Sequence, residues 1–126
     1  MPHKISVLIV DDSPQVCEAM KVNLERTKRF TVHTAQDGRV GLRLAQKIVP
    51  DVIVLDIMLP GQSGGQIAEQ LRELHSTQRI PIIFITGMIT KAEIEQRGGE
   101  IGGEIFLAKP VSTEELIATI HSVLKH

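Results

Sequence analysis

Five short apolar segments, each followed by a segment with helical spacing, constrain the fold of this chain more than any other feature. These segments are rich in valine and isoleucine: Ile5–Val10, Phe30–Ala35, Val52–Leu55 (running into Asp56), Ile80–Ile85 and Ile105–Ala108. They are mostly continuous rather than alternating, as strands that are buried on both faces should be. Because strands and helices alternate along the whole chain, we expect an α/β fold with a parallel sheet covered by helices on both faces.

The segments between the apolar runs place apolar residues on one helix face. These faces are formed by Val16, Met20 and Leu24; by Leu44, Ala45 and Ile48; by Ile67, Leu71 and Leu74; and by Leu116, Ile117, Ile120 and Leu124. Two helix starts carry additional signals. Ser13 before Pro14 is typical of an N-cap and first helical position, and Ser112 with Glu115 forms a capping box.

The segment from Thr90 to Arg97 predicts only a short helix. Four glycines follow it closely, at positions 98, 99, 102 and 103, and each glycine inside a helix costs about 1 kcal/mol relative to alanine. We expect a mobile, glycine-rich passage from this helix into the last strand.

Size, charge and cysteine content narrow the class of protein. The 126 residues suffice for one domain with one core, and we assign residues 1–126 to it. The 14 basic residues are scattered and balanced by 15 acidic ones, so we expect no direct nucleic-acid binding. The only cysteine, Cys17, forms no internal disulfide. No run has the length of a signal-peptide core or a membrane span, so we expect no membrane contact and a cytoplasmic location.

Reactive side chains follow the predicted strands at the points where they end. Asp11 and Asp12 follow the first strand, Asp56 the third, Thr86 the fourth and Lys109 the fifth. In an open parallel sheet the carboxyl ends of the strands carry the functional site. Each residue taken alone also has a purely structural explanation. Asp12 is a residue type that favours turns, Thr86 is one that caps helices, and Lys109 could be a solvated residue at a strand end. A lone buried carboxylate at Asp56 would be costly unless it were paired or bound to metal.

The three carboxylates together predict a divalent cation site. Two adjacent anions about 4 Å apart repel by roughly 4 kcal/mol at a dielectric of about 20, so we expect the Asp11–Asp12 pair to bind a cation. Oxygen ligands suit Mg²⁺ or Mn²⁺. The five histidines are dispersed and show no zinc-ligand spacing. Lys109 and Thr86 are suited to hold the phosphoryl oxygens of an anionic ligand.

Four sequence blocks in this order resemble those of a response-regulator receiver domain of two-component signal transduction. The blocks are the Asp11-Asp12 pair, "DIMLPGQSG" at 56–64, "PIIFITG" at 81–87 and "FLAKP" at 106–110, and the likeness runs from about Ile5 to Leu124. The resemblance implies a doubly wound, five-stranded flavodoxin-like sheet of order 2-1-3-4-5. It also implies a phosphorelay switch that catalyses only its own phosphorylation and dephosphorylation.

The same resemblance implies roles for individual residues. Asp56 would accept a phosphoryl group from a phosphohistidine on a sensor histidine kinase or a histidine phosphotransfer protein. Asp12 would bind Mg²⁺ directly and Asp11 mainly through water, with Asp56 and the Met58 backbone carbonyl completing the protein ligands. Lys109 would pair with the phosphoryl oxygens.

The resemblance further implies a conformational switch. Thr86 would hydrogen-bond the new phosphoryl group, and Phe106 would turn into the vacated space. The surface formed by the fourth helix, fifth strand and fifth helix would then change for a downstream effector. Without this context, Phe106 is simply a core residue. Pro110 would follow a cis peptide bond after Lys109.

Two departures from the family pattern carry expectations of their own. Met58 and Met88 lie two positions after Asp56 and Thr86. Apolar side chains there would restrict an attacking water and lengthen the life of the phosphoryl group. The alternative explanation is that these methionines simply fill gaps in the packing. The Thr86–Lys109 interval is one residue longer than usual and contains the four glycines. We therefore expect an irregularity on the output face.

Three other functions are compatible with parts of this pattern. A dehalogenase-like phosphatase needs a second aspartate two residues after the nucleophile, where this chain has Met58. A flavodoxin-like cofactor binder needs a phosphate loop after the first strand and flanking aromatics, and the chain has no tryptophan or tyrosine. A phosphorylation-independent, receiver-like interaction module is the remaining alternative. The sequence fits both a stand-alone receiver and one joined to an effector domain.

Overall fold

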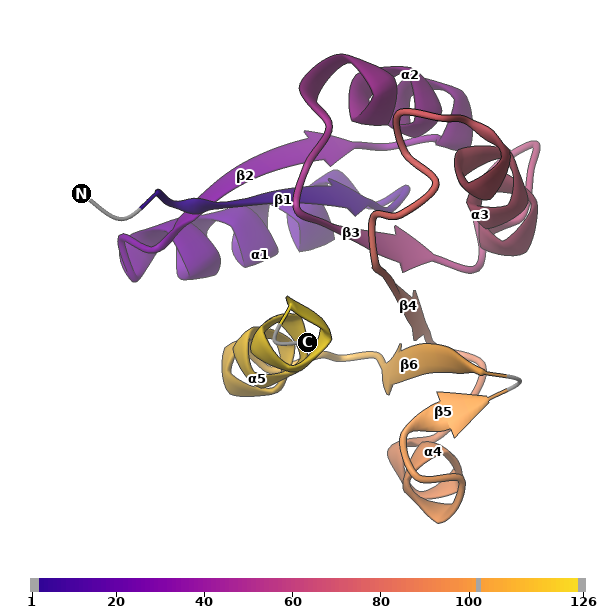
Figure 1. Cartoon of the computed structure of the whole chain (residues 1–126). Coiled ribbons are helices and arrows are strands. Elements are labelled where there is room, and N and C mark those ends of the chain that lie inside the picture. The colour runs from indigo at the N-terminus through magenta and orange to yellow at the C-terminus, as the bar shows by residue number, and fades with distance from the viewer. Residues whose placement is uncertain (1–2, 102, 125–126) are drawn as a thin grey trace.

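A twisted sheet with helices on both faces organises the protein, and the computed structural model describes residues 3–101 and 103–124 (Figure 1). The strands are β1 (Ile5–Val10), β2 (Phe30–Ala35), β3 (Val52–Asp56), β4 (Ile82–Thr86), β5 (Glu100–Ile101) and β6 (Glu104–Ala108). The helices are α1 (Pro14–Arg26), α2 (Gly38–Ile48), α3 (Gly64–Glu73), α4 (Lys91–Gln96) and α5 (Thr113–Leu124). The strand order is β2-β1-β3-β4-β6-β5.

The predicted parallel sheet is confirmed. The pairs β1–β2, β1–β3, β3–β4 and β4–β6 are all parallel, which reproduces the expected 2-1-3-4-5 order for the five predicted strands. Strand starts differ from the prediction by one or two residues: the fourth strand begins at Ile82 rather than Ile80, and the last begins at Glu104 rather than Ile105. Pro81 precedes the fourth strand and has no N–H to donate to the ladder, although its carbonyl still accepts from Ile53 N–H at 3.0 Å.

The glycine-rich passage into the last strand contains a short strand that the sequence did not predict. After the short α4, residues of β5 pair antiparallel with the start of β6, Glu100 opposite Ile105 and Ile101 opposite Glu104. Gly99 and Gly103 adopt φ of 83° and 82°, which glycine reaches without strain, so the chain turns sharply on both sides of β5. The parallel sheet therefore gains a sixth, antiparallel strand at its edge. Gly102 lies outside the described residues.

The core forms two layers, one on each face of the sheet. In Figure 1, α2 and α3 cover one face, and α1 and α5 lie on the other. Side chains of β1 alternate between these layers: Val7 and Ile9 pack toward α1 and α5, whereas Leu8 and Val10 pack toward α2 and α3. All four are essentially inaccessible to solvent, and β3 and β4 are buried throughout, so the central strands are buried on both faces as predicted. The outer strands β2 and β6 are partly exposed, which their apolar composition did not predict.

Side-chain caps begin the helices at the predicted positions. Ser13 Oγ accepts from Val16 N–H at 3.2 Å, with Pro14 as the first residue of α1. Before α5, Ser112 Oγ accepts from Glu115 N–H at 3.0 Å. No helix in residues 3–101 and 103–124 is both long enough and apolar enough to cross a membrane.

The loop between β3 and α3 turns so tightly that it needs glycine at position 64. Gly64 N–H donates to the carbonyl of Ile57 at 2.8 Å. A Cβ at Gly64 would collide with the carbonyl oxygen of Asp56 and lie 2.9 Å from Ile57 Cα. Because both obstacles are backbone atoms, no side-chain rotation relieves them. Gly64 therefore positions the end of β3.

Replacing Gly64 should destabilise the protein, whereas replacing its neighbour should not. We expect Gly64→Ala to lower the free energy of unfolding by roughly 1–3 kcal/mol because the backbone must shift. Gly65→Ala is the matched control, since the nearest atom to its added Cβ is Ser63 Oγ at 3.7 Å, and alanine in a helix gains up to about 1 kcal/mol. Urea unfolding measures both values, and equal midpoints for the two variants would contradict this account.

Candidate functional site

Three strand ends bring three carboxylates and a lysine to one edge of the sheet. Asp11 and Asp12 follow β1, Asp56 ends β3, and Lys109 follows β6. One ligand oxygen from each of the three aspartates lies within 4.8 Å of the other two. The sequence predicted this cluster from the carboxyl ends of the parallel strands, and the structure places its members together.

The site is largely buried and its charges do not balance. Asp11 and Asp56 are 0% and 2% exposed, whereas Asp12 is exposed to solvent. Lys109 Nζ lies 2.7 Å from Asp11 Oδ2 and 2.9 Å from Asp56 Oδ2. One ammonium therefore faces three carboxylates, and the cluster carries an excess of negative charge where water screens it poorly.

Backbone amides satisfy one oxygen of each buried aspartate. Ser13 N–H donates to Asp11 Oδ1 at 2.9 Å, and Met58 N–H donates to Asp56 Oδ1 at 3.0 Å. The other oxygen of Asp11 has the ion pair with Lys109 but no well-aligned hydrogen bond among the described residues. Buried polar oxygens normally have such a partner.

These donor atoms fit a small divalent cation. The set contains only oxygens, has excess negative charge, and includes a buried carboxylate oxygen with spare lone pairs, which matches Mg²⁺ or Mn²⁺. Exposed Asp12 leaves room for the water ligands that Mg²⁺ retains.

Lys109 remains charged at the site. Burial lowers the pKa of its ammonium, but the attraction of the Asp11 and Asp56 carboxylates outweighs that effect and raises the pKa above its ordinary value. The peptide bond between Lys109 and Pro110 is cis. The cation that faces Asp56 is therefore permanent at physiological pH.

Thr86 and Phe106, the predicted switch residues, make contacts outside the carboxylate cluster. Thr86 is buried at the end of β4, and its Oγ1 accepts from Met88 N–H at 3.0 Å. Phe106 on β6 is half-buried and stacks on Phe84 of β4 with ring centroids 5.2 Å apart. Thr86 thus turns its hydroxyl to its own loop, and Phe106 belongs to the core layer that faces α2 and α3.

Cys17 contacts the site, although sequence reasoning gave it no role there. Its thiol donates to the Asp11 carbonyl at 3.4 Å, and burial raises the pKa of this thiol. The sequence could have predicted this position, because Cys17 lies one helical turn after the Ser13 cap, at the end of α1 that adjoins the site. The buried, neutral thiol packs beneath the strand end that carries Asp11.

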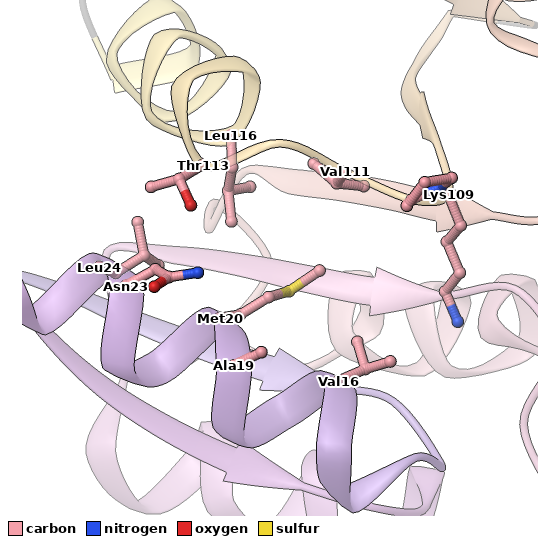
Figure 2. Close-up of a pocket in the computed structure, with 10 residues that line it drawn as sticks. Val16, Ala19, Met20, Asn23, Leu24, Lys109, Val111, Thr113 and Leu116 are labelled. Atoms are coloured by element: carbon pink, nitrogen blue, oxygen red, sulfur yellow. The ribbon is translucent and has the colours of Figure 1, made fainter.

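An apolar groove of about 390 Å³ runs between α1 and the start of α5 and ends beside Lys109. Figure 2 shows side chains of α1 facing those of the β6–α5 loop and the first turn of α5. Its apolar lining includes Val16, Ala19, Met20 and Leu116. Helical spacing assigned Val16 and Met20 to the buried face, but both are only half-buried because α5 does not close over this end of α1.

Removing the charge of Lys109 should leave two buried carboxylates unpaired. Without divalent cations, we expect Lys109→Met to lower the free energy of unfolding by about 2 kcal/mol, less than for a fully buried pair because this side chain is 26% exposed. Adding Asp56→Asn should restore part of the loss, since it removes one of the unpaired charges. Chemical denaturation of the single and double variants measures this coupling.

Lys91→Met is the matched control for that experiment. Lys91 pairs with Glu115 at 3.3 Å on the surface, where its side chain is 64% exposed. Exposed pairs contribute about 1 kcal/mol or less, so this variant should unfold nearly as the parent does. Equal losses for Lys91→Met and Lys109→Met would contradict the special position of Lys109.

Comparisons with known proteins agree with this geometry. Residues 7–121 match the response regulator receiver domain family. The chain is 33% identical over 119 residues to the DNA-binding dual master transcriptional regulator RpaA of Synechocystis, and 34% identical over 120 residues to the transcriptional regulatory protein YdfI of Bacillus subtilis. These alignments cover 94% of this chain in each case, but only 48% and 54% of the relatives, so the chain spans about half of their length.

Solved structures show the same fold over nearly the whole chain. The chemotaxis response regulator CheY4 of Vibrio cholerae superposes with a TM-score of 0.80 at 33% identity, covering 96% of this chain and 99% of that one. A putative response regulator from Chloroflexus aurantiacus gives a TM-score of 0.81 at 29% identity, covering 98% and 99%. This chain, with its strand-end carboxylates and lysine, belongs to the response regulator receiver domain family of two-component signalling.

Proposed function

We propose that this receiver domain takes a phosphoryl group from a phosphohistidine donor onto Asp56 in a Mg²⁺-dependent reaction, and that this modification switches its surface. One observation carries the proposal. The buried Asp56 carboxylate lies 2.9 Å from a permanently charged lysine and within 4.8 Å of two further carboxylates. That arrangement combines a nucleophile, a fixed cation and a set of oxygen ligands.

Positioning and electrostatics account for the reaction. Asp11, Asp12, Asp56 and the Met58 carbonyl would hold Mg²⁺ or Mn²⁺, which when bound supplies positive charge opposite the oxygens of the transferring group. A carboxylate oxygen of Asp56 forms the new bond to phosphorus while the bond from phosphorus to the donor imidazole breaks. Lys109 pairs with the phosphoryl oxygens and offsets the charge that they bring to the buried site.

The switch follows from competition for the hydroxyl of Thr86. That hydroxyl accepts from Met88 N–H at 3.0 Å, a contact of about 1 kcal/mol. A hydrogen bond to a phosphoryl oxygen is charge-assisted and roughly twice as strong, so phosphorylation favours rotation of Thr86 toward Asp56. The rotation frees space on β4 beside Phe106 on β6 and shifts the population of its rotamers.

The responding surface comprises α4, β6 and α5, with β5 along its outer edge. A hollow of about 280 Å³ lies between β6, α5 and the two glycines that precede β5, Gly98 and Gly99. Phe106 is among the residues that line it. A rotation of the Phe106 ring away from Phe84 would change the β6 side of this hollow. We propose that a downstream effector domain or protein reads this surface, in keeping with the two relatives that are named as transcriptional regulators.

The groove between α1 and α5 is the proposed seat for a helix of the phosphodonor protein. Its lining is mainly apolar and it ends at Lys109, which pairs with Asp56, so a helix in this groove would bring a phosphohistidine close to its acceptor.

We assign residues 1–126 to one receiver domain in the cytoplasm, where such donors deliver phosphoryl groups. This domain acts as a signalling switch and contacts neither nucleic acid nor membrane.

Intact mass should detect the phosphorylation directly. With Mg²⁺ and acetyl phosphate, we expect a single phosphoryl adduct that is absent when a chelator removes Mg²⁺ and absent in Asp56→Asn. Beryllofluoride, which mimics the phosphoryl group, should raise the melting temperature of the parent protein only when Mg²⁺ is present. A folded protein that forms no adduct and shows no beryllofluoride shift would favour the phosphorylation-independent interaction module.

The groove can be tested by comparing two kinds of donor. We expect Ala19→Glu to slow transfer about tenfold, which corresponds to 1.4 kcal/mol, when the donor is a phosphorylated histidine kinase that labels the parent protein. Labelling by acetyl phosphate should be unchanged, because that small donor does not use the groove. Val22→Glu is the control, since Val22 is exposed on α1 outside the groove. Equal transfer rates for the parent and Ala19→Glu would refute the proposed seat.

A further inference from the structure

We propose that Met58 and Met88 form an oxidation-sensitive pair at the mouth of the site, and that their conversion to sulfoxides by a peroxide shortens the life of the phosphoryl group on Asp56. This inference rests on the proposed function and extends it to redox control. It assigns a modification site to two side chains that take no part in holding the phosphoryl group or the cation.

Exposure distinguishes these two methionines. Met58 and Met88 are 59% and 68% exposed, more than any other large apolar side chain among the described residues. Exposed apolar surface is unfavourable in water, and both side chains lie on loops at the functional edge. A thioether is also the side-chain group most readily oxidised after a thiolate. An oxidant in solution therefore reaches both sulfur atoms without any opening of the fold.

Local geometry ties both residues to the site. Met58 N–H donates to Asp56 Oδ1, and Met88 N–H donates to Thr86 Oγ1, each at 3.0 Å. The two loops are neighbours because β3 and β4 pair, with Ile57 N–H donating to the Ile85 carbonyl at 3.1 Å. Met58 also lines a hollow of about 430 Å³ together with Asp12.

The other sulfur groups of the described chain are protected. Met20 is half-buried between α1 and α5. Cys17 is 2% exposed, and burial raises the pKa of its thiol, so it offers little reactive thiolate. Oxidation by a peroxide should therefore select the two methionines at the mouth.

The chemistry of the step is simple and reversible. A sulfur lone pair attacks one oxygen of hydrogen peroxide, the O–O bond breaks, and sulfur loses two electrons as the peroxide is reduced to water. The product is a polar sulfoxide whose oxygen accepts hydrogen bonds, and methionine sulfoxide reductases reverse it. On the loops that follow Asp56 and Thr86, an apolar side chain thereby becomes a polar one that binds water, and water is the nucleophile that removes the phosphoryl group.

Peptide mapping tests the selectivity independently of phosphorylation. Cleavage after lysine and arginine places each of the four methionines in a different peptide. After brief treatment with hydrogen peroxide, we expect Met58 and Met88 to gain oxygen at least about fivefold faster than Met20. Equal rates for the three residues would overturn the inference.

The half-life of the Asp56 adduct tests the consequence. We expect oxidation to shorten the half-life about threefold or more, and methionine sulfoxide reductase to restore it. The Met58→Leu, Met88→Leu double variant keeps two apolar side chains but cannot form sulfoxides, so the same peroxide treatment should leave its half-life unchanged. Because both residues are exposed, this variant should fold as the parent does.

The outcomes separate this inference from the proposed function. An adduct whose half-life is unaffected by oxidation of both methionines overturns the inference alone. An equal shortening in the leucine variant also overturns it, because the effect would then arise at another residue. Untreated protein that forms no adduct overturns the proposed function, and the inference with it.

Discussion

The ion pairs of Lys109 with Asp11 and Asp56 are the interaction on which the rest of the site depends. Three carboxylates lie within 4.8 Å, two of them almost fully buried, and one ammonium partly compensates them. Such a cluster would be too costly without the lysine and the amide donors of Ser13 and Met58. The remaining negative charge favours a divalent cation, which is what the proposed phosphoryl transfer requires.

The strand ends are held by the sheet, whereas the loops that follow them depend on single hydrogen bonds to Asp56 and Thr86. Asp56 and Thr86 end two buried, hydrogen-bonded strands, and each accepts a hydrogen bond from the amide two residues later in its own loop. A new partner for either side chain therefore competes with the contact that holds the loop. Through Thr86 this competition reaches the loop before α4, whose N-cap is Thr90. In the proposed switch, a phosphoryl group on Asp56 would thus change this loop while the buried strands keep their pairing.

The antiparallel β5 gives this receiver a distinctive edge. It pairs with the outer side of β6, and Arg72 at the end of α3 binds both carboxylate oxygens of Glu104 at 2.7 Å, which ties the start of β6 to the helix layer. The proposed output surface therefore includes a short hairpin whose glycines turn the backbone where other side chains would be strained. A partner that bound this surface at α4 and α5 would also contact the hairpin.

Local patterns in the sequence were sufficient to predict the parallel strands, the caps at Ser13 and Ser112, and the meeting of Asp11, Asp12, Asp56 and Lys109. Apolar runs and capping residues act over a few positions, and the ends of parallel strands necessarily share an edge. Only the tertiary structure decided the rest. The pairing of β5 depends on a free edge of β6, and the groove beside Val16 depends on how far α5 covers α1. The hydrogen bond from Met88 to Thr86 depends on a side-chain rotamer. These features arise from contacts between residues distant in sequence or from side-chain choices, which no local pattern records.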